Sequence, residues 1–327
     1  MSPLRLPGWT HGQLWILLNA AAVVSCLLLF SALLVLLSRL GLAHFWPQDS
    51  ASWIEALRLF IEQVWLFISS PMDQGGVFPA LFGTVVLVLM MALLVAPMGI
   101  LAAVYLHEYA PNNALTQLIR IAVRNLAGVP SIVYGVFGLG FFIYGMGGQL
   151  DRWFFADQLP TPTLGSPNLL WAALTLALLT LPVVIVATEE GLARIPRQVR
   201  ESALALGSNQ METLWHLVLP MASPAMMTGL ILAMARAAGE VAPLMLLGVV
   251  KLAPDLPIDG EAPYIHFDRQ FMHLGYHVFD LYSETPAVDF SLVYATALLL
   301  VGVILLLNLL ALGLRRRLRE KYRLLDS

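Results

Sequence analysis

The feature that most restricts the fold of this chain is a stretch of uncharged, mostly apolar residues at positions 14–38. A helix that crosses a membrane needs about 20 such residues, whereas the apolar core of a cleaved signal peptide has roughly 7–15. The stretch therefore predicts a retained transmembrane helix. Five further apolar runs follow, at about residues 77–106, 128–147, 169–188, 225–250 and 291–313. Together they predict an all-α polytopic membrane protein with six transmembrane helices.

Charged residues are too few for a soluble protein of this length. They make up 12% of the 327 residues, against about 25% in soluble domains, so little mass is expected outside the membrane. The net charge of −3 gives no overall positive field for binding nucleic acid. The two lysines, Lys251 and Lys321, both lie outside the Gly-Lys-Ser/Thr sequence that a phosphate-binding loop requires. The chain is therefore not expected to bind ATP itself.

Lysine and arginine accumulate on one side of the predicted spans. With the N-terminus inside, most of the 18 lysines and arginines fall in inner segments, including the loop at 189–222 and the tail after residue 313. Because positive residues mark the cytoplasmic side, both termini are predicted to be cytoplasmic. Between the first two spans, residues 53–68 repeat apolar side chains at helical spacing. They predict an amphipathic helix, either at the membrane surface or packed on the bundle.

The predicted outer loop at 251–290 is acidic and contains His273 and His277. Two histidines four residues apart share a helix face and could bind a metal ion together. The residues between them add no acidic ligand. The sequence therefore favours packing or surface histidines, and we predict no metal site.

The loop at 189–222 combines polar, basic and small apolar residues between two predicted spans. Pro196 can begin a short helix, and Gly207 can end it in a left-handed conformation. Pro220 is expected to interrupt the helical pattern again. Small or polar side chains between the first proline and the glycine would let a partner approach closely and make directional contacts: Arg200, Glu201, Ala203 and Ala205. The pattern favours a docking helix, and an amphipathic connector lying on the bilayer is the alternative.

A charged pair lies in the predicted fifth span. Arg236 and Glu240 are four residues apart, on one face of the expected helix. A charge at the centre of a membrane costs roughly 2.5–3.5 kcal/mol, so it normally faces the bundle interior or a water-filled path. Arginine before glutamate is the less favourable order on a helix, and a guanidinium fork suits phosphate oxygens. An anion-binding pair and a structural ion pair are the two interpretations.

Pro130 and Ser131 lie in the predicted third span. Proline can interrupt a helix and free backbone groups, and transporters place broken helices at solute sites. Glycines around this point favour close helix packing instead: Gly128, Gly135, Gly138 and Gly140. Ser131 is nevertheless a candidate for the solute path.

Several motifs resemble one family of membrane proteins. Glu201-Ser-Ala-Leu-Ala-Leu-Gly207, followed after nine residues by Leu217-Val-Leu-Pro220, resembles the signature loop of bacterial ABC importer permeases. Residues 96–110 and 127–139 are similar to the second and third spans of phosphate-uptake (Pst) permeases. Residues 235–244, Ala-Arg-Ala-Ala-Gly-Glu-Val-Ala-Pro-Leu, are similar to the PstA type. The resemblance covers about residues 75–313.

This resemblance implies a type I ABC importer permease fold, in which the loop forms a coupling helix seated on an ATPase subunit. It implies a PstC-type permease, a dimer of ATP-binding subunits and a periplasmic phosphate-binding protein as partners, and phosphate as the solute. ATP would be used by the partner subunits, so the chain itself would be no enzyme and would bind no cofactor. The location implied is the bacterial inner membrane.

The resemblance also implies roles for particular residues. Arg236 would contact phosphate, Glu240 would orient that arginine, and Ser131 would line the path. Contacts with the ATPase would come from the docking helix: Arg200, Glu201, Ala203, Ala205 and Gly207. Relatives often carry a basic residue near Val186, and this chain has none there, so a second phosphate-binding arginine is not expected at that position.

The chain is expected to divide into residues 1–76 (tail, first span and amphipathic segment), a permease core at 77–313 and a basic tail at 314–327. Two other functions remain open: a permease for another oxyanion or a phosphonate, and an ion-coupled secondary carrier. An intramembrane enzyme is disfavoured, because the predicted spans contain no pair of metal ligands and no nucleophile next to a base.

Overall fold

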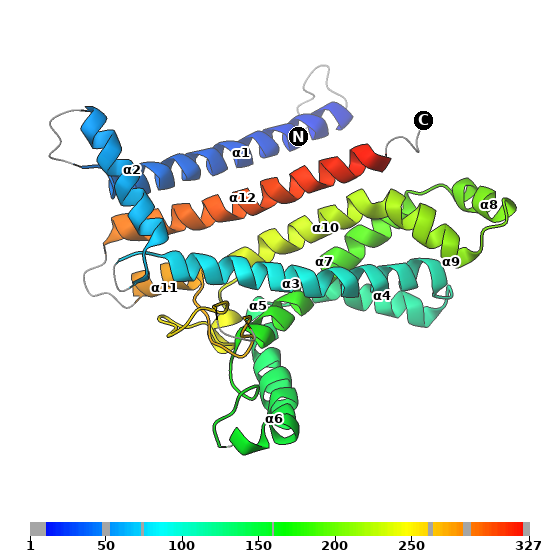
Figure 1. Ribbon diagram of the computed structural model, residues 1–327. Coiled ribbons are helices and arrows are strands. Elements are labelled where there is room, and N and C mark those ends of the chain that lie inside the picture. The colour runs from blue at the N-terminus through cyan, green and yellow to red at the C-terminus, as the bar shows by residue number, and fades with distance from the viewer. Residues whose placement is uncertain are drawn as a thin grey trace, which may run out of the picture.

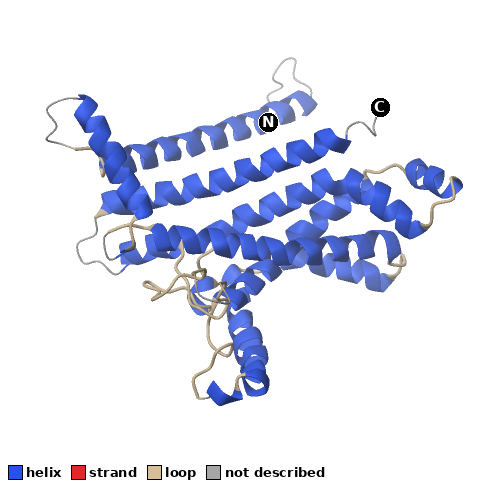
Figure 2. Cartoon of the chain, in the orientation of Figure 1, coloured by secondary structure: helices blue, strands red, loops and turns tan. Residues whose placement is uncertain are grey.

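The computed structural model describes residues 11–47, 53–72, 75–158, 160–260, 264–283 and 289–322. Within these residues the chain is built from helices and loops, without a β-strand (Figure 2). The longer helices are α1 (His11–Ala43), α2 (Trp53–Ser69), α3 (Phe78–Val104), α4 (Ala114–Leu126), α7 (Leu169–Ala193), α10 (Leu219–Gly239), α11 (Leu274–Ser283) and α12 (Phe290–Tyr322). The shorter ones are α5 (Ser131–Phe137), α6 (Gly148–Phe154), α8 (Arg197–Ala205) and α9 (Gln210–Thr213).

Six helical segments are long and apolar enough to cross a membrane, which confirms the six-span all-α prediction. They are Val23–Ala43, Phe78–Tyr109, Ser131–Phe154, Leu169–Ala193, Gln210–Gly239 and Phe290–Arg317. In Figure 1, α1, α12, α10 and α3 run along one common direction, with α2 and α11 at one end and α8 at the other. These two ends are called the α2 end and the α8 end below.

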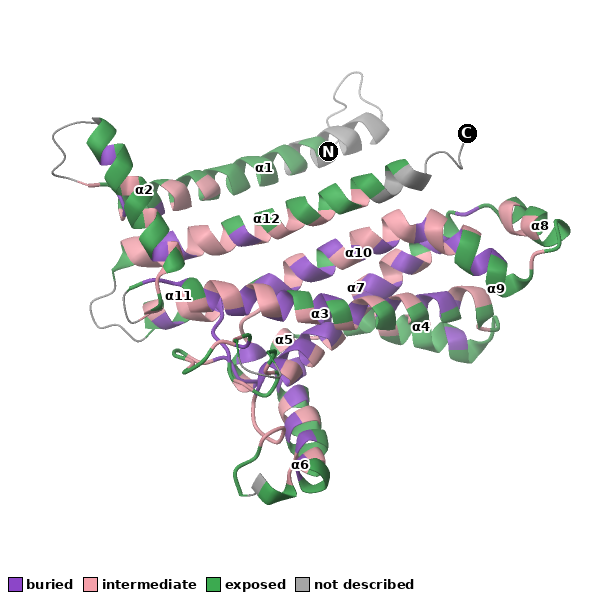
Figure 3. Cartoon of the chain, in the orientation of Figure 1, coloured by how far each residue is buried: buried purple, intermediate pink, exposed green. Residues whose placement is uncertain are grey.

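The centre of the fold lies among α3, α7 and α10. Leu87 and Met91 of α3, Leu176 of α7 and Ala237 of α10 are completely buried and belong to one apolar cluster. Burial is concentrated in these helices, whereas the described side chains of α1 from Val23 onward are mostly exposed (Figure 3). Leu29 on α1, for example, is 72% exposed, as expected of a helix whose apolar surface is left for lipid or another membrane helix.

The predicted amphipathic helix between the first two spans is confirmed as α2. Its Phe67 packs against Phe45, with ring centroids 5.1 Å apart, and both rings are buried. Ile61 and Trp65 are exposed on other faces of α2. The helix therefore rests on the bundle and also leaves an apolar face that could lie in the membrane surface.

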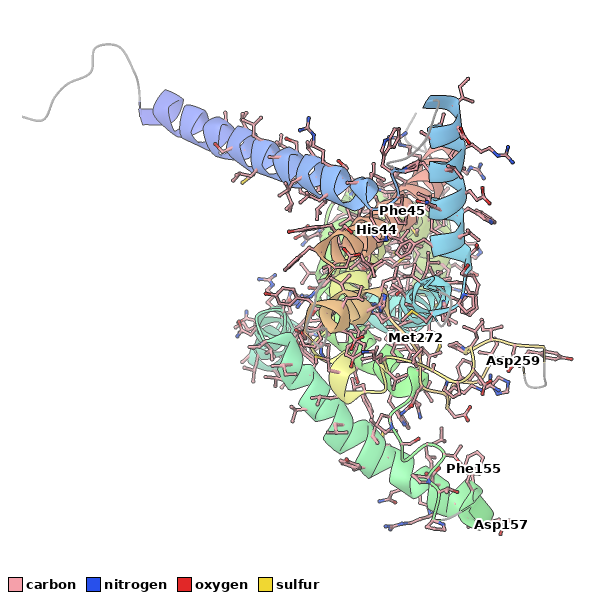
Figure 4. The ribbon with its side chains drawn as sticks, turned by 90° about the vertical axis from the view of Figure 1, so that its left-hand side faces the viewer. His44, Phe45, Phe155, Asp157, Asp259 and Met272 are labelled. Carbon is pink, nitrogen blue, oxygen red and sulfur yellow. The ribbon has the colours of Figure 1, made fainter. Side chains whose placement is uncertain are left out.

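Close backbone contact joins α3 to the segment that leads into α11. A Cβ atom added to Gly83 would lie 2.1 Å from the carbonyl oxygen of Met272. The next residue, Thr84, accepts a hydrogen bond at its Oγ1 from the Leu274 backbone at 2.9 Å. In Figure 4, Met272 is seen where the α2 end of the bundle faces the viewer. Gly83 therefore sets how closely the segment before α11 can approach the bundle.

Gly83→Ala should destabilise the protein by about 1–3 kcal/mol, because the new methyl group must displace backbone. Gly302→Ala on α12 is the matched control, since a Cβ there meets nothing within 4 Å and alanine favours a helix by about 1 kcal/mol. Thermal unfolding of the two detergent-solubilised variants by circular dichroism measures the difference. Equal melting temperatures would contradict the close approach at Gly83.

The third span begins and ends later than predicted. The apolar run suggested residues 128–147, but the chain first forms α4 and then breaks at Ala127–Pro130, and the span covers Ser131–Phe154. Pro130 takes an extended conformation at the start of α5 (ψ 136°), which proline accepts readily at the edge of a helix. Beyond α5 the helix is π-helical over Gly138–Gly147 (η3) and continues as α6. Figure 1 shows this α5–α6 arm projecting away from the bundle.

The far end of this arm is held by one carboxylate. Asp151 is 2% exposed and accepts three backbone hydrogen bonds, from Thr163, Leu164 and Gly165, at 2.7–3.0 Å. Three donors satisfy a buried carboxylate that would otherwise be costly to desolvate. The loop that returns to α7 is thereby fixed against α6.

The prediction for the fifth span was wrong at both ends. The helix does not run from 225 to 250: it is continuous from Gln210 to Gly239, through Pro220. Pro220 does not break it, because proline is tolerated in the first turn of α10 and follows a π-helical turn, η5 (Leu214–Val218). At the other end, Pro243 cannot donate to a helix ladder and disfavours helical backbone just before itself. The chain leaves the helix at Glu240 (φ −80°, ψ 127°).

Candidate functional site

The predicted docking helix is α8 (Arg197–Ala205), which lies at one end of the molecule (Figure 1). α8 starts after Pro196, which is extended (ψ 142°), and Gly207 follows it with φ +94°. A positive φ costs other residues roughly 1–2 kcal/mol, so glycine suits this turn. The helix end predicted at Gly207 is confirmed.

The tip of α8 is uncovered in this chain. Glu201 and Ala205 are exposed and Ala203 is half-buried, while Leu206 just after the helix is 90% exposed. Leu204 is also exposed, so two leucine side chains lie uncovered at this tip. A partner that covered it would remove the leucine side chains from water.

Arg200 points into the molecule instead. Its Nη2 atom lies 2.8 Å from Glu108 Oε1, and its guanidinium also donates to the carbonyl oxygens of Leu192 and Ile195. Glu108 belongs to a π-helical turn, η2 (Tyr105–Tyr109), at the end of α3. These contacts join α8 to the ends of α3 and α7, and a contact of Arg200 with another subunit stays a prediction.

A second arginine lies beside this ion pair. Arg120 of α4 donates to the carbonyl oxygen of Leu106 in η2 at 2.6 Å, and its Nε atom lies 3.4 Å from Glu189 of α7. Two arginines therefore hold the same π-helical turn from two sides. A cavity of about 440 Å³ opens beside them, lined by His107, Glu108, Asn112, Arg120, Arg197, Arg200 and Glu201.

The charged pair of the fifth span forms at the other end of α10. Arg236 Nε and Glu240 Oε1 are 3.4 Å apart, and their side chains are 31% and 19% exposed. The prediction placed Glu240 on the same helix as Arg236, but Glu240 lies just beyond the end of that helix. The pair uses Nε. Within the part of the chain that the structure describes, the terminal nitrogens of Arg236, the fork that binds oxyanions, are left for another ligand.

Helix α5 packs beside this pair. A Cβ added to Gly135 of α5 would lie 2.8 Å from Pro243 Cα, three residues beyond Glu240. Ser131 is the first residue of α5, one turn before this contact. The structure thus joins Arg236 directly to Glu240 and places Ser131 at the start of the neighbouring helix.

The two histidines of the predicted outer loop lie on α11 and just before it. His273 is 1% exposed, and its Nδ1 accepts a hydrogen bond from the Gly275 backbone at 3.1 Å. Burial lowers the pKa of His273 to about 4, and burial also lowers the pKa of His277. His273 is therefore a packed, neutral residue, in line with the packing interpretation.

Acid should destabilise the protein through His273. Its ordinary pKa of 6.5 applies to the unfolded chain and about 4 to the folded one, so the unfolded state takes up a proton first as the pH falls. Stability is complete above pH 6.5 and falls between pH 6.5 and 4, by about 2 kcal/mol at pH 5. Thermal unfolding at pH 7.5 and pH 5 measures this. His273→Gln should show a smaller drop, and an unchanged drop would contradict the assignment.

Residues 95–323 match the model of the family described as "Binding-protein-dependent transport system inner membrane component". The chain belongs to this family. The permease is 33% identical over 241 residues to "Phosphate transport system permease protein PstA 1" of Mycobacterium tuberculosis, covering 74% of this chain and 71% of that protein.

Solved structures confirm the fold. The permease superposes on a chain of the inward-facing MetNI methionine ABC transporter with a TM-score of 0.54 at 16% identity, covering 79% of this chain and 98% of that one. A bacterial ABC transporter for the acidic polysaccharide alginate gives the same TM-score at 14% identity, covering 93% and 99%. The predicted importer permease fold is therefore confirmed.

Sequence reasoning missed three parts of this permease. In the sequence, Glu108 and Leu206 stand out only within motifs that resemble the family, and nothing marks Arg120 for a role at the site. The signal available for Leu206 was its place next to Gly207, the predicted end of the docking helix. No spacing in the sequence indicates that Glu108 meets Arg200.

Proposed function

We propose that this chain is the transmembrane permease subunit of an ATP-driven importer that moves inorganic phosphate from the periplasm to the cytoplasm. The observation that carries the proposal is the Arg236–Glu240 pair at the end of a membrane-spanning helix, in a chain whose relative is named a phosphate permease. A guanidinium with its fork free can bind the oxygens of phosphate. Glu240 holds Arg236 in place and weakens the field that the anion meets.

In this proposal the chain works in an assembly. Its partners are a PstC-type permease, a dimer of ATP-binding subunits and a periplasmic phosphate-binding protein. The ATP-binding subunits hydrolyse ATP, and this chain contributes neither catalysis nor a cofactor site. The assembly lies in the bacterial inner membrane, with both termini and the α8 end in the cytoplasm, because the basic segments concentrate there.

Transport would follow alternating access. Closure of the ATP-binding dimer would move α8, which contacts that dimer through Glu201, Ala203, Ala205 and Gly207. The permease core at 77–313 would then rearrange around a path lined by Arg236, Glu240 and Ser131. Residues 1–76 and the basic tail at 314–327 flank this core.

Reconstitution of the complex in proteoliposomes tests the proposal. The chain should co-purify with an ATP-binding subunit, and phosphate with its binding protein should stimulate ATP hydrolysis and be taken up. Sulfate and methylphosphonate are offered in parallel, because stimulation by either of them alone would indicate a permease for a different oxyanion. Uptake without an ATP-binding subunit would indicate an ion-coupled carrier and would overturn the proposal.

A further inference from the structure

The π-helical turn η2 at the α8 end of α3 carries an unusual set of polar contacts. π-Helical turns are rare and occur often at functional positions. Within η2, the carbonyl oxygen of Leu106 accepts a hydrogen bond from Arg120, and Glu108 pairs with Arg200 at 2.8 Å. Leu106 itself is buried. The end of α3 is thus held by one arginine from α4 and one from α8.

Helix α8 depends on such contacts for its position. It has nine residues, none of them buried, and a helix this short is marginal by itself. Val199 packs against an apolar cluster formed by η5 and the ends of α3, α7 and α10. The strongest polar contact of α8 is the Arg200–Glu108 pair, whose side chains are only 20% and 21% exposed. A charge-assisted hydrogen bond shielded in this way is among the stronger kinds.

The contacts continue from η2 to the charged pair. α3 packs on α7 and α10 through Met91 and Val95, which share a cluster with Ala233 and Ala237 of α10. Ala237 is the residue next to Arg236. A displacement of α3 along its axis would therefore also displace the last turn of α10. Close-packed interiors transmit such displacements because they deform little.

We propose that Glu108 and Arg200 are positioning residues that make α8 and the adjoining end of α3 move as one body. The inference rests on the proposed function, in which α8 receives the movement of the ATP-binding subunits. The ion pair passes that movement directly to α3, and so to the wall that carries Arg236. Neither residue touches phosphate. Arg120 extends the same connection to α4 through Leu106, and to α7 through Glu189.

Glu108→Gln tests the ion pair in the reconstituted complex. The number of phosphate ions transported per ATP hydrolysed should fall by about tenfold, the effect of losing one charge-assisted hydrogen bond, while the ATP-binding subunits still co-purify. The exchanged pair, Glu108→Arg with Arg200→Glu, should recover part of this ratio. Glu190→Gln is the control, because its pair with Arg194 is exposed and 4.0 Å long, and it should leave the ratio unchanged.

A thiol cross-link tests the single-body movement itself. Glu108→Cys and Arg200→Cys are introduced together with Cys26→Ser, which removes the chain's single cysteine. Without cross-linker, this variant should show the low ratio of Glu108→Gln. A short bifunctional thiosulfonate that joins the two cysteines should raise the ratio again.

Opposite results overturn the inference. If cross-linking blocks transport in a variant that otherwise transports normally, α8 and α3 must separate during the cycle. If Glu108→Gln transports normally, the pair has no positioning role. If both Glu108→Gln and the exchanged pair fail to assemble with the ATP-binding subunits, the contact serves folding only. Failure of the unmutated complex to transport phosphate would instead count against the proposed function.

Discussion

Arg236→Gln should lower phosphate uptake by about 10- to 100-fold while the permease still assembles with its partners. Glutamine is shorter than arginine but keeps a polar side chain without the charge. A hydrogen bond to a charged group contributes about 1.5–3 kcal/mol, with 1.4 kcal/mol for each factor of ten. Arg236 is 31% exposed, so its loss should not unfold the bundle. Uptake of radioactive phosphate by cells lacking the native permease measures the effect.

Two variants complete this experiment. Arg58→Gln is the matched control, because Arg58 is exposed on α2, outside the permease core at 77–313; it should transport normally. Glu240→Gln should bind phosphate more tightly and release it more slowly, since the countercharge at 3.4 Å is gone. Normal uptake by Arg236→Gln would remove this arginine from the mechanism. Loss of assembly would mark the pair as structural.

Leu206→Glu should reduce co-purification of the ATP-binding subunit by about 10- to 100-fold. Leu206 is 90% exposed in this chain, so the change leaves the permease fold intact. In a complex the leucine would be buried, and burying it contributes about 1.5–3 kcal/mol, which a carboxylate forfeits. Pull-down of the tagged subunit with solubilised permease measures the loss.

The control for this prediction lies at the other end of the molecule. Leu252 is 63% exposed in the segment that follows the fifth span, and Leu252→Glu should leave co-purification unchanged. If both variants bind the subunit as well as the unmutated permease does, α8 does not dock through its apolar tip. Equal losses in both would indicate general damage to the protein.

The sequence indicated the spans well but placed their ends less well. Apolar runs found all six spans, because membrane crossing demands length and low charge. The fifth run contained Pro243, which ends helical backbone near Glu240, so hydropathy alone extended this helix too far. Helix α4 was missed because its 13 residues include Arg120 and Arg124 and do not form an apolar run.

The candidate site was only partly visible in the sequence. The distance of four residues between Arg236 and Glu240 predicted their contact, and Gly207 predicted the end of the docking helix. Arg200 was expected to face a partner, whereas Glu108, 92 residues earlier in the chain, holds it inward. Such a contact depends on how α3 and α8 are brought together, and local spacing does not contain that information.

The end of α10 at Gly239 has an electrostatic consequence for the solute. The carbonyl groups of a helix's final turn carry partial negative charge, equivalent to roughly half an electron, and here they lie beside Arg236. An anion bound there would be attracted by the positive charge of Arg236, and the Glu240 carboxylate and these dipoles would cancel part of that attraction. The affinity of such a site for the anion is low. In the proposed importer, high affinity would then come from the periplasmic protein that delivers the anion, and the membrane subunit could turn over quickly.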